Sequence, residues 1–305
     1  MKSTAPTTSV RARVSFYAGA FTASQRDYDE AFTLFDDARR LYAELHDDKG
    51  VAAMVTALGT NRRLRGDLNA GRAWLEQGLN MYRGLQDRPG IASLASNLAD
   101  VLSAQGDDAS ARTLMQEALG IFRELGDSSG VGWSFNRLGD IASHDGDLKE
   151  AQRLYEEGAA VFRMIEDQWG MARSYADLGF LACQQVQLQR ARLLFVQALE
   201  TLQTLGHTRG MARVFEGLAC LAIETQSPER ALTLAGAAAG LREALGSASR
   251  PEEELTLQRK LQAAWENLDA AQARALWTLG SSMPLEEAIR YALESPGGRI
   301  RIVAT

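Results

Sequence analysis

A glycine recurs every 40 residues through most of this 305-residue chain, with no insertion between successive copies. The positions are Gly50, Gly90, Gly130, Gly170 and Gly210. A leucine follows in the same frame, at Leu58, Leu98, Leu138, Leu178 and Leu218. Self-similarity at a fixed period indicates a repeat architecture, in which each unit buries its apolar face against its neighbours. The period therefore constrains the fold more than any other feature of the sequence.

Three further columns of the repeat hold only alanine or glycine. One of them reads Gly19, Gly59, Ala99, Gly139, Gly179 and Ala219. Small residues at fixed positions indicate that two helices approach closely there, so we expect Gly139 to have no room for a side chain. We expect the leucine column to supply buried apolar surface, together with a second apolar column: Leu45, Leu85, Leu125, Ile165, Leu205 and Leu245.

Turn residues divide each repeat into two helices. Gly66-Asp67, Gly106-Asp107 and Gly146-Asp147 each combine a left-handed helix-ending glycine with a helix-capping aspartate. Asp27-x-x-Glu30 and Asp147-x-x-Glu150 match the capping-box pattern, and Ser227-Pro228 is expected to act as cap and first helical residue. A second cap column reads Asp47, Asp87, Asp127 and Asp167, until His207 interrupts it. Gln185-Val186-Gln187 lacks the turn glycine, so a different turn is expected there.

These signals predict an all-α fold: a right-handed superhelical solenoid of about six helix-turn-helix repeats over residues 11–250. In the second repeat, helix A is expected near 51–65 and helix B near 68–85. Residues 251–295 are expected to form capping helices, and residues 1–10 and 296–305 to be flexible ends.

Composition excludes several classes of function. The net charge of −6 provides no basic footprint for nucleic acid. No apolar stretch is long enough to span a membrane, and the N-terminus lacks a secretory signal, which predicts a cytoplasmic protein. The three histidines occupy different repeat positions, so we expect no metal and no cofactor. Cys183 and Cys220 are interpreted as small buried apolar residues.

The repeat resembles the tetratricopeptide repeat. The small and large positions of that family correspond here to Leu58-Gly59, Gly71, Leu75 and Gly78, and to their equivalents 40 residues apart, including Tyr155 and Phe195. The usual repeat has 34 residues; this sequence resembles a longer subtype found in signalling proteins. It departs from the family where the first-helix tyrosine is replaced, for example by Arg62 or Leu102, and where the repeat-ending proline is absent.

The C-terminal part resembles the repeat sensor region of bacterial signal-transduction ATPases and LuxR- or AfsR-type regulators. The similar segments begin at Leu234, Pro251 and Met283. That resemblance implies that the segment after the last repeat closes the solenoid, using Trp265, Leu268, Leu276, Trp277, Leu285, Ile289 and Leu293. No G-x-x-x-x-G-K-[ST] phosphate loop occurs, so an ATPase domain would have to be covalently linked in a larger parent protein.

In the tetratricopeptide family helix A lines the concave groove, which implies a ligand site on the middle repeats. The candidate groove residues are Asn97, Asp100, Trp133, Asn136, Arg137, Asp140, Arg173 and Asp177. Asn, Asp and Arg can bond the backbone and termini of an extended peptide, and Trp and Arg are typical anchors. The alternative is that the Arg137–Asp140 and Arg173–Asp177 pairs simply neutralise one another, each contributing under ~1 kcal/mol.

The sequence thus predicts a non-catalytic module that binds a protein or peptide in its groove, as the sensor region of an ATPase-coupled transcriptional regulator. A stand-alone scaffold or peptide receptor is the alternative, and a hydrolase with a site in the groove is a remote one.

Overall fold

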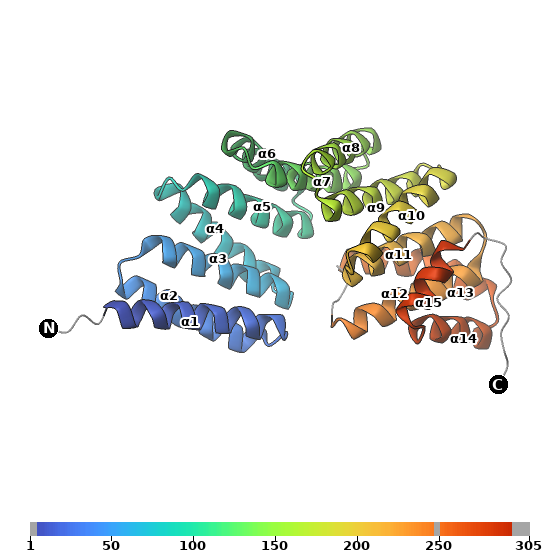
Figure 1. Ribbon diagram of the computed structural model, residues 1–305, viewed down its shortest axis with the longest axis horizontal. Helices are drawn as coiled ribbons and strands as arrows, with labels where there is room; N and C mark the ends of the chain where they lie inside the picture. Colours follow the sequence, from blue (N-terminus) through green and yellow to red (C-terminus); the bar gives the residue numbers. More distant parts are fainter. Residues whose placement is uncertain (1–4, 247–250, 295–305) are drawn as a thin grey trace. The chain divides into compact units, whose positions relative to one another are not determined.

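The computed structural model describes residues 5–246 and 251–294, and all regular secondary structure in these ranges is helical (Figure 1). The all-α prediction is confirmed. The helices are α1 (Ala5–Ser24), α2 (Tyr28–Glu44), α3 (Asp48–Arg65), α4 (Leu68–Gly84), α5 (Arg88–Ala104), α6 (Asp108–Leu125), α7 (Ser128–His144), α8 (Leu148–Met164), α9 (Gln168–Gln184), α10 (Leu188–Thr204), α11 (Thr208–Glu224), α12 (Pro228–Ala244), α13 (Pro251–Asn267), α14 (Ala270–Ser281) and α15 (Leu285–Leu293).

Two compact units make up the chain. Unit 1 is Met1–Asp147 and contains α1 to α7; unit 2 is Leu148–Thr305 and contains α8 to α15. Within each unit, consecutive helices pack against one another as the 40-residue period predicts. The first helix begins at Ala5, earlier than the expected start at residue 11, so residues 5–10 belong to α1 rather than to a flexible end. The tail expected at 296–305 lies outside the described residues.

The aspartate cap column forms as expected. Asp47, Asp87, Asp127 and Asp167 each accept a hydrogen bond from the backbone N–H three residues later, at 2.8–3.1 Å. Such caps satisfy one of the orphan donors at the start of a helix. His207, which interrupts the column in sequence, keeps the same role: its Nδ1 accepts from the N–H of Gly210 at 3.1 Å.

The turn between helices A and B keeps one conformation with different residues. Gly66, Gly106 and Gly146 are left-handed, with φ of 95°, 80° and 80°. Val186 stands at the same repeat position with φ of 58°. The turn without glycine therefore does not differ in conformation, and a β-branched residue is held where glycine is preferred. Ser227 stands at the N-cap position and Pro228 is the first residue of α12, as expected, but the Ser227 Oγ donates to the carbonyl of Thr225 and makes no side-chain cap.

Each glycine of the 40-residue column lies against a large side chain from the helix before it. A Cβ at Gly50 would lie 2.5 Å from the ring of Tyr42, and one at Gly130 equally close to the ring of Phe122. The pairs Gly90–Tyr82, Gly170–Phe162 and Gly210–Leu202 repeat the contact. The large side chain of one helix B thus packs onto the bare backbone at the start of the next helix A.

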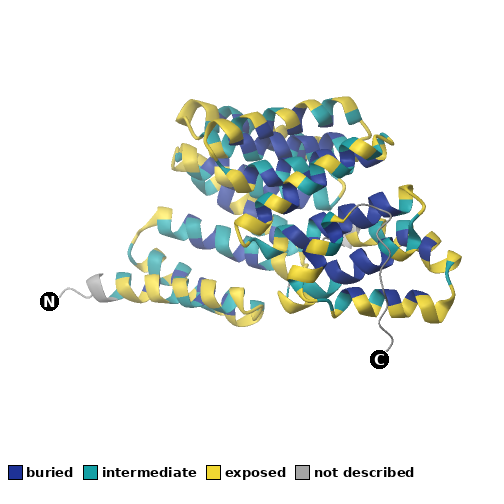
Figure 2. Cartoon of the chain, turned by 45° about the vertical axis from the view of Figure 1, so that its right-hand side comes forward, coloured by how far each residue is buried: buried dark blue, intermediate teal, exposed yellow. Residues whose placement is uncertain are grey.

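Buried residues lie on the faces where helices meet (Figure 2). The leucine column is buried throughout. A Cβ at Gly59 or at Gly179 would lie less than 3 Å from the side chain of Leu75 or Phe195, as the small-residue columns predicted. The expectation for the second apolar column is wrong. These residues lie at the ends of the B helices, and Leu85, Leu125, Ile165, Leu205 and Leu245 are 37–46% exposed.

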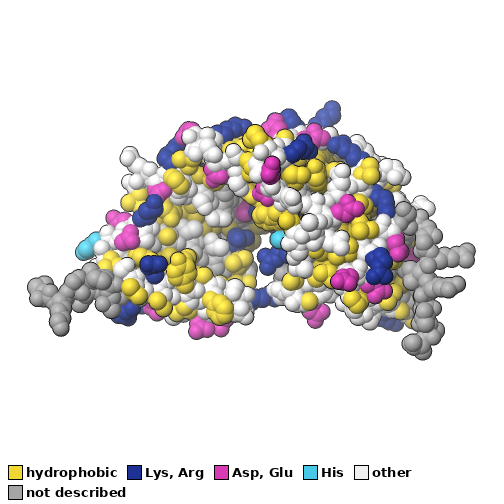
Figure 3. Space-filling view, viewed as in Figure 1, with side chains coloured by type: hydrophobic (Ala, Val, Ile, Leu, Met, Phe, Trp, Pro, Cys, Tyr) yellow, Lys and Arg dark blue, Asp and Glu magenta, His cyan; other side chains and the backbone are white. Residues whose placement is uncertain are grey.

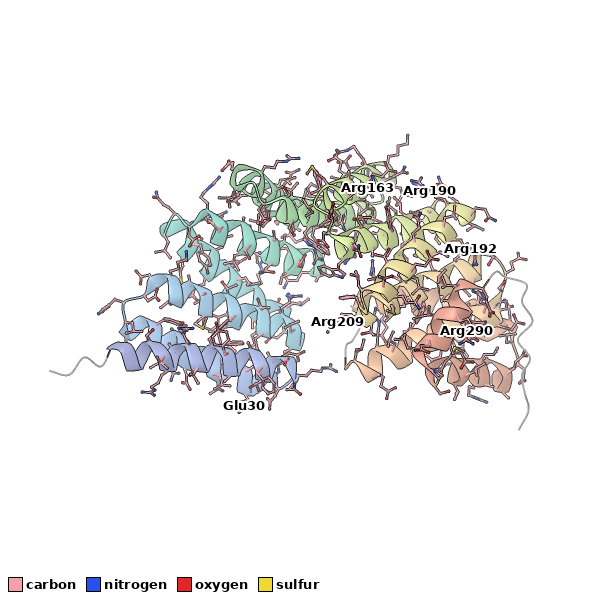
Figure 4. All side chains as sticks on the ribbon, viewed as in Figure 1. Glu30, Arg163, Arg190, Arg192, Arg209 and Arg290 are labelled. Atoms are coloured by element: carbon pink, nitrogen blue, oxygen red, sulfur yellow. The ribbon has the colours of Figure 1, made fainter. Side chains whose placement is uncertain are left out.

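The C-terminal helices cover the last repeat, although Trp265, one of the residues expected to close the solenoid, is 36% exposed. Leu276 and Ile289 are buried in the core of unit 2, and Leu268, Trp277, Leu285 and Leu293 pack against that core. Arg192, which extends from α10 (Figure 4), donates hydrogen bonds to the carbonyls of Leu293 and Glu294. Arg230 on α12 donates to the carbonyls of Tyr291, Ala292 and Glu294, so two guanidinium groups hold the end of α15.

Candidate functional site

The predicted polar residues of unit 1 form an ion cluster on α5 and α7, which are neighbouring A helices, that is, the first helices of successive repeats. Trp133, Arg137 and Asp140 follow one another at helical spacing on α7, so they share one face of that helix. The guanidinium of Arg137 lies 3.2 Å from the carboxylate of Asp100 on α5 and 3.9 Å from that of Asp140. All three side chains keep about a quarter of their surface exposed (21–27%).

Unit 2 carries the opposite arrangement. Asp177 on α9 accepts from Nε of Arg173 on the same helix at 2.6 Å, and from Nη2 of Arg213 on α11 at 2.9 Å. The guanidinium of Arg213 also lies over the ring of Phe180, 4.9 Å from its centroid. The Asp177 side chain is almost fully buried, whereas both arginines are about a fifth exposed.

The structure brings the predicted residues together in two groups, one in each unit. Asn97, Asp100, Trp133, Arg137, Asp140 and Arg173 are partly exposed. Asn136 and Asp177 are 1% and 2% exposed, so both lie inside the helix stack and neither presents a surface to a ligand directly. The two ion pairs offered as the alternative interpretation, Arg137–Asp140 and Arg173–Asp177, are both present, and each also involves a residue one repeat away.

Two further buried polar residues lie outside these two clusters. Glu216 on α11 is held by Arg242 on α12 through two hydrogen bonds of 2.6 and 2.9 Å, which form a bidentate pair. Asn61 on α3 is 1% exposed, and neither atom of its amide has a hydrogen-bond partner among the described residues. The repeat frame could have pointed to Asn61, because the equivalent residues are Val101, Ile141 and Leu181.

The surroundings of the two cysteines do not activate them as nucleophiles. Burial raises the pKa of Cys183 to about 12 and that of Cys220 to about 11. A thiol with so high a pKa is a poor nucleophile at neutral pH. No group of three or more possible metal ligands occurs among residues 5–246 and 251–294. Within the same ranges, no helix combines the length and apolarity needed to cross a membrane.

Comparison with known proteins gives one family match and many similar folds. The tetratricopeptide-repeat family model matches residues 90–164. No curated protein sequence matches the chain. Solved structures with a similar fold include aspartyl phosphate phosphatase F from Bacillus subtilis, with a TM-score of 0.69 and 14% identity, covering 93% of this chain and 75% of that one.

Two other similar structures are regulators or sensors. The Rap conjugation gene regulator of plasmid pLS20, in complex with the Phr* peptide, has a TM-score of 0.58 and 12% identity, covering 87% of this chain and 75% of that one. A signal-transduction ATPase with numerous domains and a tetratricopeptide-repeat sensor, from Pyrococcus horikoshii, has a TM-score of 0.62 and 16% identity, covering 92% of this chain and 43% of that one. Residues 90–164 therefore carry tetratricopeptide repeats, and the described chain has the fold of tetratricopeptide-like repeat proteins.

Proposed function

We propose that this protein is a non-catalytic module that binds a peptide or an extended protein segment on the A-helix faces of its repeats. The observation that carries the proposal is the pair of ion clusters, Asp100–Arg137–Asp140 in unit 1 and Arg173–Asp177–Arg213 in unit 2. Each cluster is partly exposed and joins two successive A helices, so charged groups of both signs lie along the face on which a ligand would pack. Such groups can pair with charged or polar groups of a ligand and fix its orientation.

The clusters offer groups of both signs to a ligand. The carboxylate of Asp100 can accept hydrogen bonds from a lysine, an arginine or an amino terminus, and a guanidinium group such as that of Arg137 can bind a carboxylate with paired hydrogen bonds. Trp133, on the same face as Arg137, offers a large amphipathic surface for a side chain of the ligand. Binding through such partly hydrated charges should weaken as salt increases.

A peptide library selected against the purified chain tests this function. The selected peptides are synthesised, and their affinity is measured by fluorescence anisotropy for wild type, Arg137→Ala and Trp133→Ala. We expect each variant to lose at least about tenfold in affinity, or ~1.4 kcal/mol. Arg112→Ala is the matched control: Arg112 lies on helix B of unit 1, bonded to Asp145, and its loss should leave affinity unchanged. Equal affinity for all four proteins would refute the A-helix site.

Within this function we favour a sensor region of an ATPase-coupled transcriptional regulator. The similar Pyrococcus structure supports this choice, since the chain spans less than half of that protein. The alternative, a stand-alone peptide receptor, is favoured by the similar Rap regulator, whose structure was solved in complex with a peptide and of which the chain covers 75%. An antibody against the repeats distinguishes them on a blot of host extract: a band well above 33.2 kDa supports the linked ATPase, and a band at that mass refutes it.

A further inference from the structure

The outer face of α1 carries a stripe of large apolar side chains with no covering element among the described residues. Val10, Val14, Tyr17 and Phe21 follow one another at helical spacing, so they lie on one face. They are 58%, 61%, 61% and 69% exposed. The opposite face is buried against α2, where Phe16 meets the ring of Phe35 at 6.1 Å. Hydrophobic side chains are visible at the surface over this end of unit 1 (Figure 3).

Two of the four columns, those of Val14 and Phe21, are interface positions in the later repeats, whereas the Tyr17 column holds the partly exposed Asn97 and Arg137. Val14 corresponds to Met54, Leu94 and Val214, which are at most 3% exposed. Phe21 corresponds to Val101, Ile141 and Leu181, which are equally buried. In those repeats the preceding helix B packs against the A helix, as α4 does against α5 and α10 against α11. A contiguous apolar stripe of this kind marks an interaction surface, because single exposed apolar residues would not align.

A further repeat of the same type does not fit this face. In the later repeats a large side chain from the preceding helix B packs onto the glycine of the 40-residue column. In α1 that position is Val10, whose side chain occupies the space that the ring would need. The stripe therefore suits a partner helix that packs against side chains at all four positions.

We propose that the stripe on α1 is a self-association surface, on which α1 of a second copy packs antiparallel about a two-fold axis. In an antiparallel pair centred between residues 15 and 16, Val10 lies opposite Phe21 of the second copy, and Val14 lies opposite Tyr17. Each aromatic ring then meets a small β-branched side chain, and the surface is complementary to itself, as a two-fold interface requires.

Charge selects the antiparallel direction. The described part of α1 has two charged side chains, Arg11 and Arg13, both in its first half and both exposed. A parallel pair would place these arginines beside their equivalents in the second copy. The antiparallel pair places them beside Ala20 and Ala18 of the second copy, near the end of the helix that carries the negative pole of its dipole. The contact involves one helix from each copy, so the association is expected to be weak and dependent on concentration.

Sedimentation equilibrium of the full chain, over roughly 1 μM to 1 mM, tests the proposal. The weight-average mass is expected to rise from 33.2 kDa toward twice that value. Val14→Arg should keep the protein at the monomer mass throughout, with an unchanged circular-dichroism spectrum, because the side chain is exposed. Leu193→Arg is the matched control: Leu193 is an equally exposed apolar residue on α10, and the variant should associate like wild type. A monomer at every concentration, or association that survives Val14→Arg, overturns the proposal.

Disulfide trapping tests the direction of packing. Val10→Cys mixed with Phe21→Cys should give a covalent dimer on mild oxidation, because the two positions face each other. Val10→Cys alone should stay monomeric, because its two copies would lie roughly 16 Å apart along the helices, beyond the reach of a disulfide. The native cysteines are buried and do not compete. A covalent dimer from Val10→Cys alone would refute the antiparallel arrangement.

Discussion

Arg213 on α11 donates a 2.9 Å hydrogen bond to Oδ1 of Asp177 on α9, across a distance of nearly one repeat in sequence. Arg173 occupies the other oxygen, so the buried carboxylate is held from its own helix and from the next A helix. Asp177→Ala should therefore lower the free energy of unfolding by about 3 kcal/mol, the low end for a broken buried pair, since both arginines retain contact with water. Urea denaturation measures this. Arg173→Ala should cost less, because Arg213 still pairs with the carboxylate, and equal costs would contradict the bridging role.

Replacing Val186 with glycine should stabilise the protein. Its φ of 58° is left-handed, a conformation that costs a residue with a side chain about 1–2 kcal/mol. Glycine avoids this cost but loses more entropy on folding, so Val186→Gly should raise the free energy of unfolding by roughly 1 kcal/mol. Thermal melting measures the change. Gln226→Gly, at the same turn position with φ of 54°, should gain less because glutamine is not β-branched; no gain at Val186 would contradict the strain.

Gly130 and Gly120 should respond to the same substitution in opposite directions. A Cβ at Gly130 would overlap the ring of Phe122, whereas one at Gly120 meets nothing within 4 Å. Gly130→Ala should destabilise by about 1–3 kcal/mol through overpacking. Gly120→Ala, in the interior of α6, should stabilise by up to about 1 kcal/mol through helix propensity. Chemical denaturation measures the free energy of unfolding of both variants. If both are stabilised, contact with the large side chain of the preceding helix B does not explain the glycine column. For the same reason Gly139→Leu, in the small-residue column, is predicted to destabilise the protein through overpacking.

The cysteines should behave as reporters of unfolding. With pKa values of about 12 and about 11, Cys183 and Cys220 have roughly one thiolate per thousand molecules or fewer at pH 8. A thiol reagent at pH 8 should therefore modify neither residue in the folded protein, and both in denaturant. Burial raises both thiol pKa values above the ordinary thiol value. The stabilisation that comes from keeping these thiols neutral is therefore present at neutral pH, and it is lost as the pH rises through 9 to 12. Rapid labelling of the folded chain would contradict the burial.

The periodic features are predictable from sequence because each depends on one residue type at a fixed spacing. Glycine spacing predicts the repeats, aspartates predict the helix starts, and Leu58 with its equivalents predicts the core. The partners of the glycine column are not predictable in this way, because Tyr42, Phe122 and Leu202 share only size. Hydrophobicity places the column from Leu85 to Leu245 in the core, since it does not reveal that a helix end faces water.

The candidate site is harder to predict for a different reason. Helical spacing places Arg137 beside Asp140, but the contacts to Asp100 and from Arg213 to Asp177 depend on how one helix rotates against the next. Polarity alone assigns Asn136 to an accessible face, whereas the structure buries it. In a close-packed array, polarity predicts solvent contact less well than position in the repeat does.

The glycines at the contact between α12 and α14 restrict how an array of this type can change its number of repeats. A Cβ at Gly236 would overlap the carbonyl oxygen of Trp277, one at Gly240 that of Ser281, and one at Gly280 that of Thr233, so α12 and α14 touch backbone to backbone. An ordinary helix A, with side chains on its approaching face, cannot take the place of α14. Gene duplication of an inner repeat recreates helix–helix contacts that already exist in the array. Duplication of the last repeat requires a helix–helix contact that does not exist elsewhere in it. Lineages of such proteins should therefore change length by gaining or losing inner units, while the terminal α12–α14 pair is inherited as a block.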